Sequence, residues 1–204
     1  MLKTEHDVTV LILAGGLGRR VNNQNKGLLL VHGKPLIEYI IDKIKHQTKN
    51  IIINANQNTA AYEALGYPVI ADKYPDHQGP LAGILSCEHA VTTELVLTIP
   101  CDTPLLPEDL LDKMLQTYNS HSPEQLCVVH DGERIQNLFL LFHRTKFAHL
   151  AEFFTNNRRK VADWIQSQVY NRCDFSNQKT NFLNINTEEN LVALQKVLKS
   201  NNKC

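Results

Sequence analysis

The chain has 204 residues, 43% of them hydrophobic, which is enough for one domain with a core that needs no disulfides or metals. Its 21 basic and 21 acidic side chains give a formal net charge of zero, so no overall field favours nucleic acid or a membrane surface as a partner. We therefore expect a single domain over residues 1–204 that has no nucleic-acid or membrane partner.

Apolar runs alternate with helical patterns along the chain. The first run, residues 8–13, is rich in β-branched side chains and too short for a buried helix, so it predicts a strand covered on both faces. In chain order, further strands are expected at 51–53, 68–71, 95–99, 126–129, 138–142 and 182–185, and helices at 35–44, 59–65, 80–90, 107–118, 145–154, 160–168 and 187–198. This alternation predicts an α/β fold of three layers, with a mostly parallel, twisted, Rossmann-like sheet and helices on both faces.

Small or polar residues come directly after the first four strands. Gly15, Asn54, Asp72 and Asp102 occupy these places in turn. The carboxyl ends of strands in an open α/β sheet line one crevice, and ligands bind there. The four positions therefore predict one site at this edge of the sheet.

The first strand runs into the glycine-rich stretch L-A-G-G-L-G-R-R at residues 13–20, and Lys26 follows. Glycines let backbone N–H groups gather around an anion, and the cations add charge where phosphates would lie. The stretch is not a P-loop, because Lys26 follows an asparagine, and it is not a dinucleotide fingerprint, because Val21 replaces the third glycine. It predicts a site for a nucleoside triphosphate; a turn that binds nothing would explain neither the arginines nor Lys26.

Asp102 lies within P-C-D-T-P, residues 100–104, where a buried strand ends. Proline fixes φ, so this carboxylate is held stiffly. Mg²⁺ takes one or two protein oxygens and completes its octahedron with phosphates and water. We expect Asp102 to bind Mg²⁺ beside the triphosphate; the alternative is that it caps a turn or the following helix.

Eight motifs extend across nearly the whole chain in a fixed order. They are L-A-G-G, N-K-G-L-L, G-K-P-L, N-A-N, G-P-L-A-G, P-C-D-T-P, H-D-G-E-R and N-I-N-T, beginning at residues 13, 25, 33, 54, 79, 100, 130 and 184. Together they resemble the molybdenum cofactor guanylyltransferases. The resemblance implies that GTP and Mo-molybdopterin are substrates, Mg²⁺ is the cofactor, and molybdopterin guanine dinucleotide and pyrophosphate are the products.

The resemblance also implies which residues act on GTP. The implied GTP contacts are Leu13, Ala14, Gly15, Gly16, Lys26, Asn54, Asp72 and Asp102. Lys26, Arg19 and Asp102 would carry catalysis, and Asp102 would hold the metal. Guanine would be recognised by backbone carbonyls near Leu13 or by the Asn54 and Asp72 side chains; each of these two side chains has an alternative role in a strand-end turn.

The N-terminal half is thus expected to bind GTP and the C-terminal half to bind molybdopterin. Asn184 and Asn186 resemble residues on the pterin side, and Arg158 begins a basic run suited to an anionic phosphate and dithiolene. A solvated surface is the alternative for Arg158, and a helix cap that pairs with Glu189 is the alternative for Asn186.

The chain departs from the family at two places. Asn22, Asn23 and Asn25 stand where the family commonly has glycines and an acid before the lysine, and residues 136–138 lack an expected proline. Asparagine tolerates a positive φ, so the loop can keep its shape, but the missing negative charge beside Lys26 could change how it closes.

Five cysteines without a C-x-x-C pair and an N-terminus without an apolar signal region predict a cytoplasmic protein. Transient contact with cofactor-synthesis proteins and acceptor molybdoenzymes is expected. Two rival functions stay open: a nucleotidyltransferase that uses CTP or a sugar-phosphate acceptor, and a non-catalytic carrier of GTP or cofactor. A carrier would not need a metal-binding carboxylate at Asp102.

Overall fold

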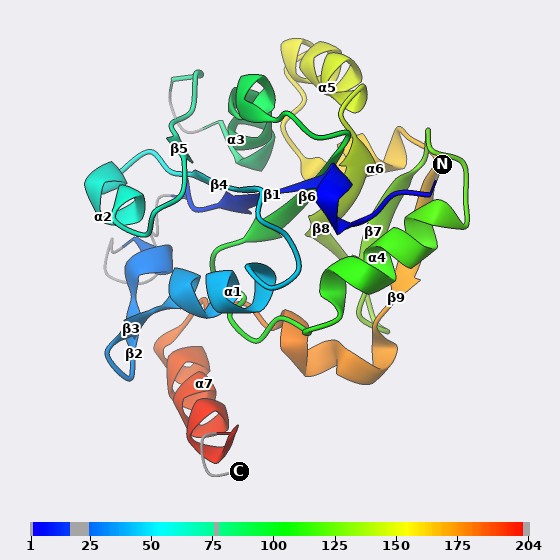
Figure 1. Ribbon diagram of the computed structural model, residues 1–204. Helices are drawn as coiled ribbons and strands as arrows, with labels where there is room; N and C mark the ends of the chain where they lie inside the picture. The colour runs from blue at the N-terminus through cyan, green and yellow to red at the C-terminus, as the bar shows by residue number, and fades with distance from the viewer. Residues whose placement is uncertain (1, 17–24, 76–77, 202–204) are drawn as a thin grey trace.

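A computed structural model describes residues 2–16, 25–75 and 78–201. Its centre is a seven-stranded sheet in the order β5-β4-β1-β6-β8-β7-β9 (Figure 1). All neighbours are parallel except β8, which is antiparallel to both β6 and β7. The strands are β1 Val8–Leu13, β4 Ile51–Asn54, β5 Val69–Ile70, β6 Leu95–Pro100, β7 Leu126–His130, β8 Ile135–His143 and β9 Tyr170–Asp174.

Helices cover both faces of this sheet, which confirms the predicted three-layer architecture (Figure 1). One face carries α1 (Leu36–Ile44), α2 (Thr59–Glu63) and α4 (Leu110–Asn119). The other carries α3 (Pro80–Ser86), α5 (Lys146–Thr155) and α6 (Val161–Gln166). The longer helices α1, α4 and α5 turn an apolar stripe to the sheet, at the three- and four-residue spacing that brings side chains to one helix face, whereas the short α2 buries only Tyr62. In α1 this stripe consists of Ile37, Ile40, Ile41 and Ile44, all buried, whereas the buried Leu36 packs with Val31 and Leu194 instead.

The last helix, α7 (Glu188–Asn201), projects away from the sheet (Figure 1). Its buried Leu194 packs in a third, small apolar cluster with Leu36, Ile185 and Val31. Val31 belongs to a short hairpin, β2 (Leu30–Val31) and β3 (Lys34–Pro35). Among the described residues, no helix is both long and apolar enough to cross a membrane.

The predicted strand at 182–185 is wrong. A 3-10 helix, Ser176–Phe182, occupies the start of this region, and the buried Phe182 and Ile185 pack in clusters without a strand ladder. The true edge strand is β9, which sequence reasoning missed. Its sequence Y-N-R-C-D buries only Cys173, so it lacks the apolar pattern that identifies buried strands.

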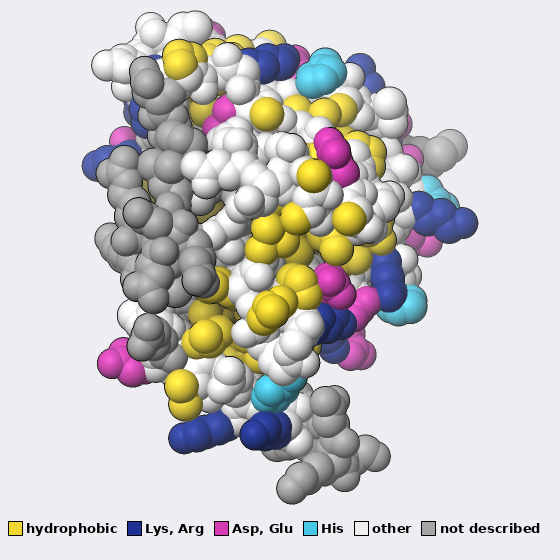
Figure 2. Space-filling view, turned by 90° about the vertical axis from the view of Figure 1, so that its left-hand side faces the viewer, with side chains coloured by type: hydrophobic (Ala, Val, Ile, Leu, Met, Phe, Trp, Pro, Cys, Tyr) yellow, Lys and Arg dark blue, Asp and Glu magenta, His cyan; other side chains and the backbone are white. Residues whose placement is uncertain are grey.

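The face on the left of Figure 1 is shown in Figure 2, where basic and acidic side chains are interspersed over the coloured surface. Hydrophobic side chains gather toward the middle of this view. No large area of one sign covers the described part of this face. The neutral overall composition is therefore matched by a mixed surface here.

Asp131 organises the turn between β7 and β8. Its Oδ1 accepts hydrogen bonds from the backbone N–H groups of Glu133 (2.9 Å) and Arg134 (2.8 Å), and its Oδ2 accepts one from Gln136 Nε2 (2.5 Å). Burial alone would raise the pKa of Asp131, but these hydrogen bonds outweigh it and hold the pKa below its ordinary value. The carboxylate of the H-D-G-E-R motif thus has a structural role in this turn.

We expect Asp131→Asn to lower the free energy of unfolding by about 2 kcal/mol at pH 7, because an amide cannot accept from Gln136 where its own N–H₂ lies. A carboxyl with a lowered folded-state pKa stabilises the fold above its ordinary pKa and loses that effect as the pH falls. The difference in the free energy of unfolding between the variant and wild type, measured by urea unfolding, should therefore shrink below about pH 4. A difference that stays constant to about pH 2 would contradict this role; the exposed Asp112→Asn is the control.

Candidate active site

Two backbone hydrogen bonds tie together the strand ends that carry the predicted residues. The Ala14 N–H donates to the Asn54 carbonyl (2.8 Å), and the Cys101 N–H donates to the Leu13 carbonyl (3.1 Å). β1 lies between β4 and β6, where the chain order of the strands reverses. This is the place where open α/β sheets form ligand crevices, and the segments beginning at Gly15 and Asp102 both start there.

Asp72 is held by two side-chain amides. Asn54 Nδ2 donates to Asp72 Oδ1 and Asn56 Nδ2 donates to Asp72 Oδ2, each at 2.8 Å. The Asp72 N–H in turn donates to Asn56 Oδ1 at 2.7 Å. Each carboxylate oxygen keeps a further lone pair, so Asp72 can accept hydrogen bonds from a ligand as well.

Asn54 lies between two glycines that are far apart in sequence. A Cβ at Gly15 would lie 3.1 Å from Asn54 Oδ1, and a Cβ at Gly83 would lie only 2.3 Å from it. The Asn54 side chain is buried, and its Nδ2 also donates to the Ile70 carbonyl at 3.1 Å. The motifs L-A-G-G, N-A-N and G-P-L-A-G therefore meet at this carboxamide, and the glycines are required for close packing.

A second cluster contains Lys26, Asp102 and Asn186. Lys26 Nζ forms an ion pair with Asp102 Oδ2 at 3.0 Å and also donates to Asn186 Oδ1. The side chains of Lys26 and Asp102 are 21% and 14% exposed, so the pair is partly shielded from solvent. The structure thus brings Asn186, which was predicted for the other half of the site, onto the lysine of the glycine-rich loop.

The segment around Asn186 packs directly on the P-C-D-T-P turn. The Ile185 N–H donates to the Asp102 carbonyl (2.8 Å), and Thr103 Oγ1 donates to Asn184 Oδ1 (2.9 Å). The alternative in which Asn186 caps the last helix is wrong. Thr187 Oγ1 accepts from the Asn190 N–H at 3.2 Å and is the cap, which leaves the Asn186 side chain facing Lys26.

Arg158 lies elsewhere. It is exposed after α5, with its guanidinium 4.0 Å from the centre of the Phe153 ring. No contact among the described residues joins it to Asn184 or Asn186. The basic run therefore begins on the helical layer opposite α1, and the three residues predicted for molybdopterin do not form one cluster. Arg19, Asn22 and Asn23 lie outside the described residues, and Gly16 is exposed.

Asp102 is suited to a hard divalent cation. Lys26 engages Oδ2, whereas no hydrogen bond between described residues occupies Oδ1. No group of three or more His, Cys, Asp or Glu side chains in the described ranges could hold a metal. A cation here would take most of its ligands from phosphate and water, as Mg²⁺ does. Burial, and then the Asp102 charge, raise the pKa of the Cys101 thiol to about 12, so it stays neutral and supplies no thiolate.

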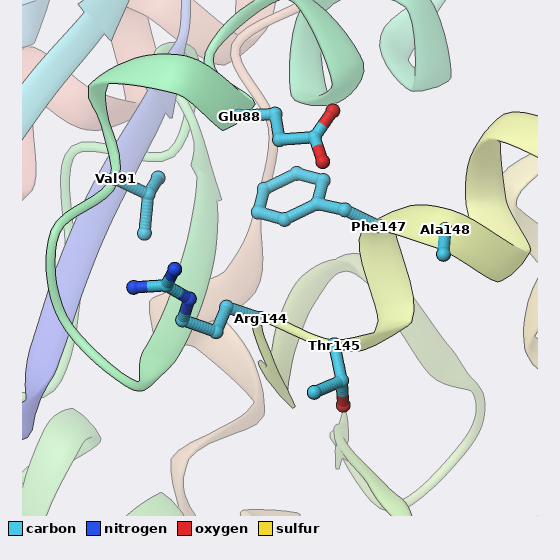
Figure 3. Close-up of a pocket in the computed structure, with 6 residues that line it drawn as sticks. All are labelled: Glu88, Val91, Arg144, Thr145, Phe147 and Ala148. Carbon is cyan, nitrogen blue, oxygen red and sulfur yellow. The ribbon is translucent and has the colours of Figure 1, made fainter.

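A separate open pocket of about 280 Å³ lies between the segments around Glu88 and Arg144 (Figure 3). In this view Glu88 and Arg144 lie on either side of the Phe147 ring. The Arg144 N–H donates to the Glu94 carbonyl just before β6, whereas Asp102 follows the other end of that strand. The pocket therefore lies away from the clusters described above and contains none of the predicted site residues.

Known proteins share this sequence and fold. The MobA-like NTP transferase domain matches residues 10–172. The molybdenum cofactor guanylyltransferase of Shewanella woodyi is 40% identical over 89% of this chain and 92% of that protein, and the one from Vibrio cholerae is 37% identical over 91% and 90%. The crystal structure of molybdopterin-guanine dinucleotide biosynthesis protein A from Archaeoglobus fulgidus has a TM-score of 0.76, covers 94% of this chain and 99% of that one, and at 17% identity supports the fold alone.

We expect Gly83→Ala to lower the free energy of unfolding by about 2 kcal/mol, because the new methyl group must displace the Asn54 carboxamide from between the two glycines. Thermal and urea unfolding measure the change. Gly16→Ala is the matched control, since a Cβ at Gly16 would meet no atom of the described residues within 4 Å. Equal stability of the two variants would show that Asn54 does not need this space.

Proposed function

The chain belongs to the molybdenum cofactor guanylyltransferases, within the MobA-like NTP transferase domain family, and we propose that it transfers GMP from GTP to Mo-molybdopterin. The products would be molybdopterin guanine dinucleotide cofactor and pyrophosphate. The observation that carries this proposal is the direct contact of Lys26, from the phosphate-loop motif, with Asp102, from the metal motif.

The triphosphate would lie along the backbone of Leu13, Ala14, Gly15 and Gly16, with Lys26 on its phosphates. Arg19 stays a prediction as a further cation. Guanine presents two N–H donor groups, so it needs acceptors. The Leu13 carbonyl accepts from Cys101 and Asn54 Oδ1 faces two glycines, whereas Asp72 offers two charged oxygens, each of which can accept another hydrogen bond. We therefore assign guanine recognition to Asp72, with Asn54 holding it in place.

In the reaction, an oxygen of the molybdopterin phosphate would attack the α-phosphorus of GTP. A new P–O bond would form while the bond from the α-phosphorus to the bridging oxygen breaks, and pyrophosphate would leave with that electron pair. The attacking oxygen is already anionic near pH 7, so no strong general base is required. Positioning and charge neutralisation would supply most of the rate, with Lys26 steadying the leaving phosphates.

Asp102 would hold the divalent metal, and we propose Mg²⁺. When bound, such an ion would neutralise phosphate charge and act as a Lewis acid toward the α-phosphorus. The Oδ1 of Asp102 supports this assignment, because no hydrogen bond from the described residues occupies it while Lys26 engages Oδ2.

The second substrate would be bound beside Asn184 and Asn186. The contact of Asn186 with Lys26 supports this, since the two substrates must meet where the phosphates react. Arg158 stays a prediction for a more distant anionic group of that substrate. All four cysteines within the described residues are buried free thiols, which supports our proposal of a cytoplasmic reaction. We also propose transient contact with cofactor-synthesis proteins and acceptor molybdoenzymes.

The decisive experiment incubates the protein with Mo-molybdopterin, GTP and Mg²⁺ and looks for GMP in the released cofactor together with pyrophosphate. A panel with CTP and ATP, and with a sugar phosphate as acceptor, tests the rival transferase. GTP binding without product, in the presence of Mg²⁺ and acceptor, would favour the carrier instead.

We expect Asp102→Ala to lower turnover by about a hundredfold or more, and Lys26→Ala by about tenfold or more, because each removes charge stabilisation from the transition state. Pyrophosphate release at saturating GTP and Mg²⁺ measures both. The exposed Asp112→Ala is the control for loss of a carboxylate. Near-normal rates in the two site variants would count against these roles.

If Asp72 recognises guanine, Asp72→Asn should weaken GTP binding by about tenfold or more, because an amide N–H₂ would face the donors of the base. Binding of ATP, which lacks those donors, should change much less. Equilibrium binding of both nucleotides gives the ratio. An equal loss for GTP and ATP would assign Asp72 to holding the loop rather than to reading the base.

A further inference from the structure

Tyr62 on α2 is fully buried, and its hydroxyl lies beneath the turn that carries Lys26. Tyr62 Oη donates a hydrogen bond to Asn25 Oδ1 at 2.5 Å. Burial, and then the nearby Cys101, raise the pKa of this phenol above its ordinary value, so it remains a donor at all ordinary pH values. The bond thus joins the helical layer to the phosphate-loop motif.

Asn25 holds the start of that turn. The 3-10 helix Lys26–Leu28 begins directly after it, and the Asn25 carbonyl accepts from the Leu28 N–H at 3.0 Å. Fixing the Asn25 side chain therefore fixes the direction in which the next residue, Lys26, leaves the backbone.

Gly27 holds the turn from the other side of Lys26. A Cβ at Gly27 would lie 2.5 Å from Tyr62 Oη and 3.4 Å from Cys101 Cβ. The backbone of the turn is therefore packed between the tyrosine hydroxyl and the residue that precedes Asp102. Tyr62 touches both neighbours of Lys26, and Lys26 touches Asp102 at 3.0 Å.

We propose that Tyr62 is a positioning residue for the transfer reaction: its hydroxyl holds Asn25 and Gly27 so that Lys26 Nζ faces Asp102 and the triphosphate. The inference rests on the proposed role of Lys26 as a phosphate contact. Tyr62 itself is fully buried, so its role in this proposal is indirect. Removing its hydroxyl leaves Lys26 present but less well directed, which is a loss in orientation rather than in charge.

The test compares Tyr62→Phe with Tyr118→Phe. Tyr118 is also buried in the same core, and its hydroxyl donates to the Pro123 carbonyl at 2.8 Å, on α4 and away from Lys26. Each variant deletes one buried hydroxyl and should lower the melting temperature. Only Tyr62→Phe should lower kcat/KM for GTP, by about tenfold. Equal kcat/KM values in the two variants would overturn the proposal.

The Lys26→Ala background separates positioning from general destabilisation. If Tyr62 acts through Lys26, adding Tyr62→Phe to Lys26→Ala should lower kcat/KM by less than about twofold. A further tenfold loss in this background would show that the hydroxyl acts through the fold instead.

Asn25→Leu removes the acceptor of the Tyr62 hydrogen bond. It should lower kcat/KM for GTP as much as Tyr62→Phe does, and the double variant should show no additional loss. Asn25→Leu also provides the test of the proposal if Tyr62→Phe does not fold.

Equilibrium binding of GTP keeps this inference distinct from the proposed function. If wild type forms no cofactor product but Tyr62→Phe alone weakens GTP binding, the transferase assignment fails and the positioning role stands. If wild type forms the product, and Tyr62→Phe matches it both in GTP affinity and in kcat/KM, the positioning role fails and the transferase assignment stands.

Discussion

The ion pair between Lys26 and Asp102 joins two segments that lie 76 residues apart. It forms because β1 and β6 are parallel neighbours and because the Cys101 N–H extends their ladder to the Leu13 carbonyl. The two side chains have opposite charges and limited exposure, so they attract each other with little screening by solvent. A bound polyanion and its cation would give each side chain a new partner of the opposite sign. The contact thus keeps both charges at the crevice before any ligand arrives.

On the other side of the crevice, neutral amide groups hold the Asp72 carboxylate. Asp72 is fixed by the amides of Asn54 and Asn56, not by a lysine or arginine. Amide donors orient a carboxylate without cancelling its charge, so Asp72 keeps its acceptor strength for a ligand. The glycines that pack on Asn54 bring three separate motifs to one place.

Much of this arrangement was predictable from sequence, because buried parallel strands have continuous apolar runs and the residues after them share one edge. Gly15, Asn54, Asp72 and Asp102 were all located in this way. The edge strand β9 was missed because most of its side chains are polar. The apolar Phe182 and Ile185 were mistaken for part of a strand, because apolar residues also pack in the core where the backbone forms no strand hydrogen bonds. The contact of Asn186 with Lys26 depends on tertiary packing across 160 residues, which no local pattern encodes.

The packing of the 184–186 segment on Asp102 has a consequence for biosynthesis of the protein. Strands β1, β4 and β6 and the P-C-D-T-P turn all lie within residues 8–104, whereas Asn186 is translated 82 residues after Pro104 (186 − 104). A nascent polypeptide on the ribosome can therefore build the sheet edge well before the last asparagine emerges to reach Lys26. A product truncated before residue 184 would therefore have the Lys26–Asp102 pair without Asn184 and Asn186 packed beside it.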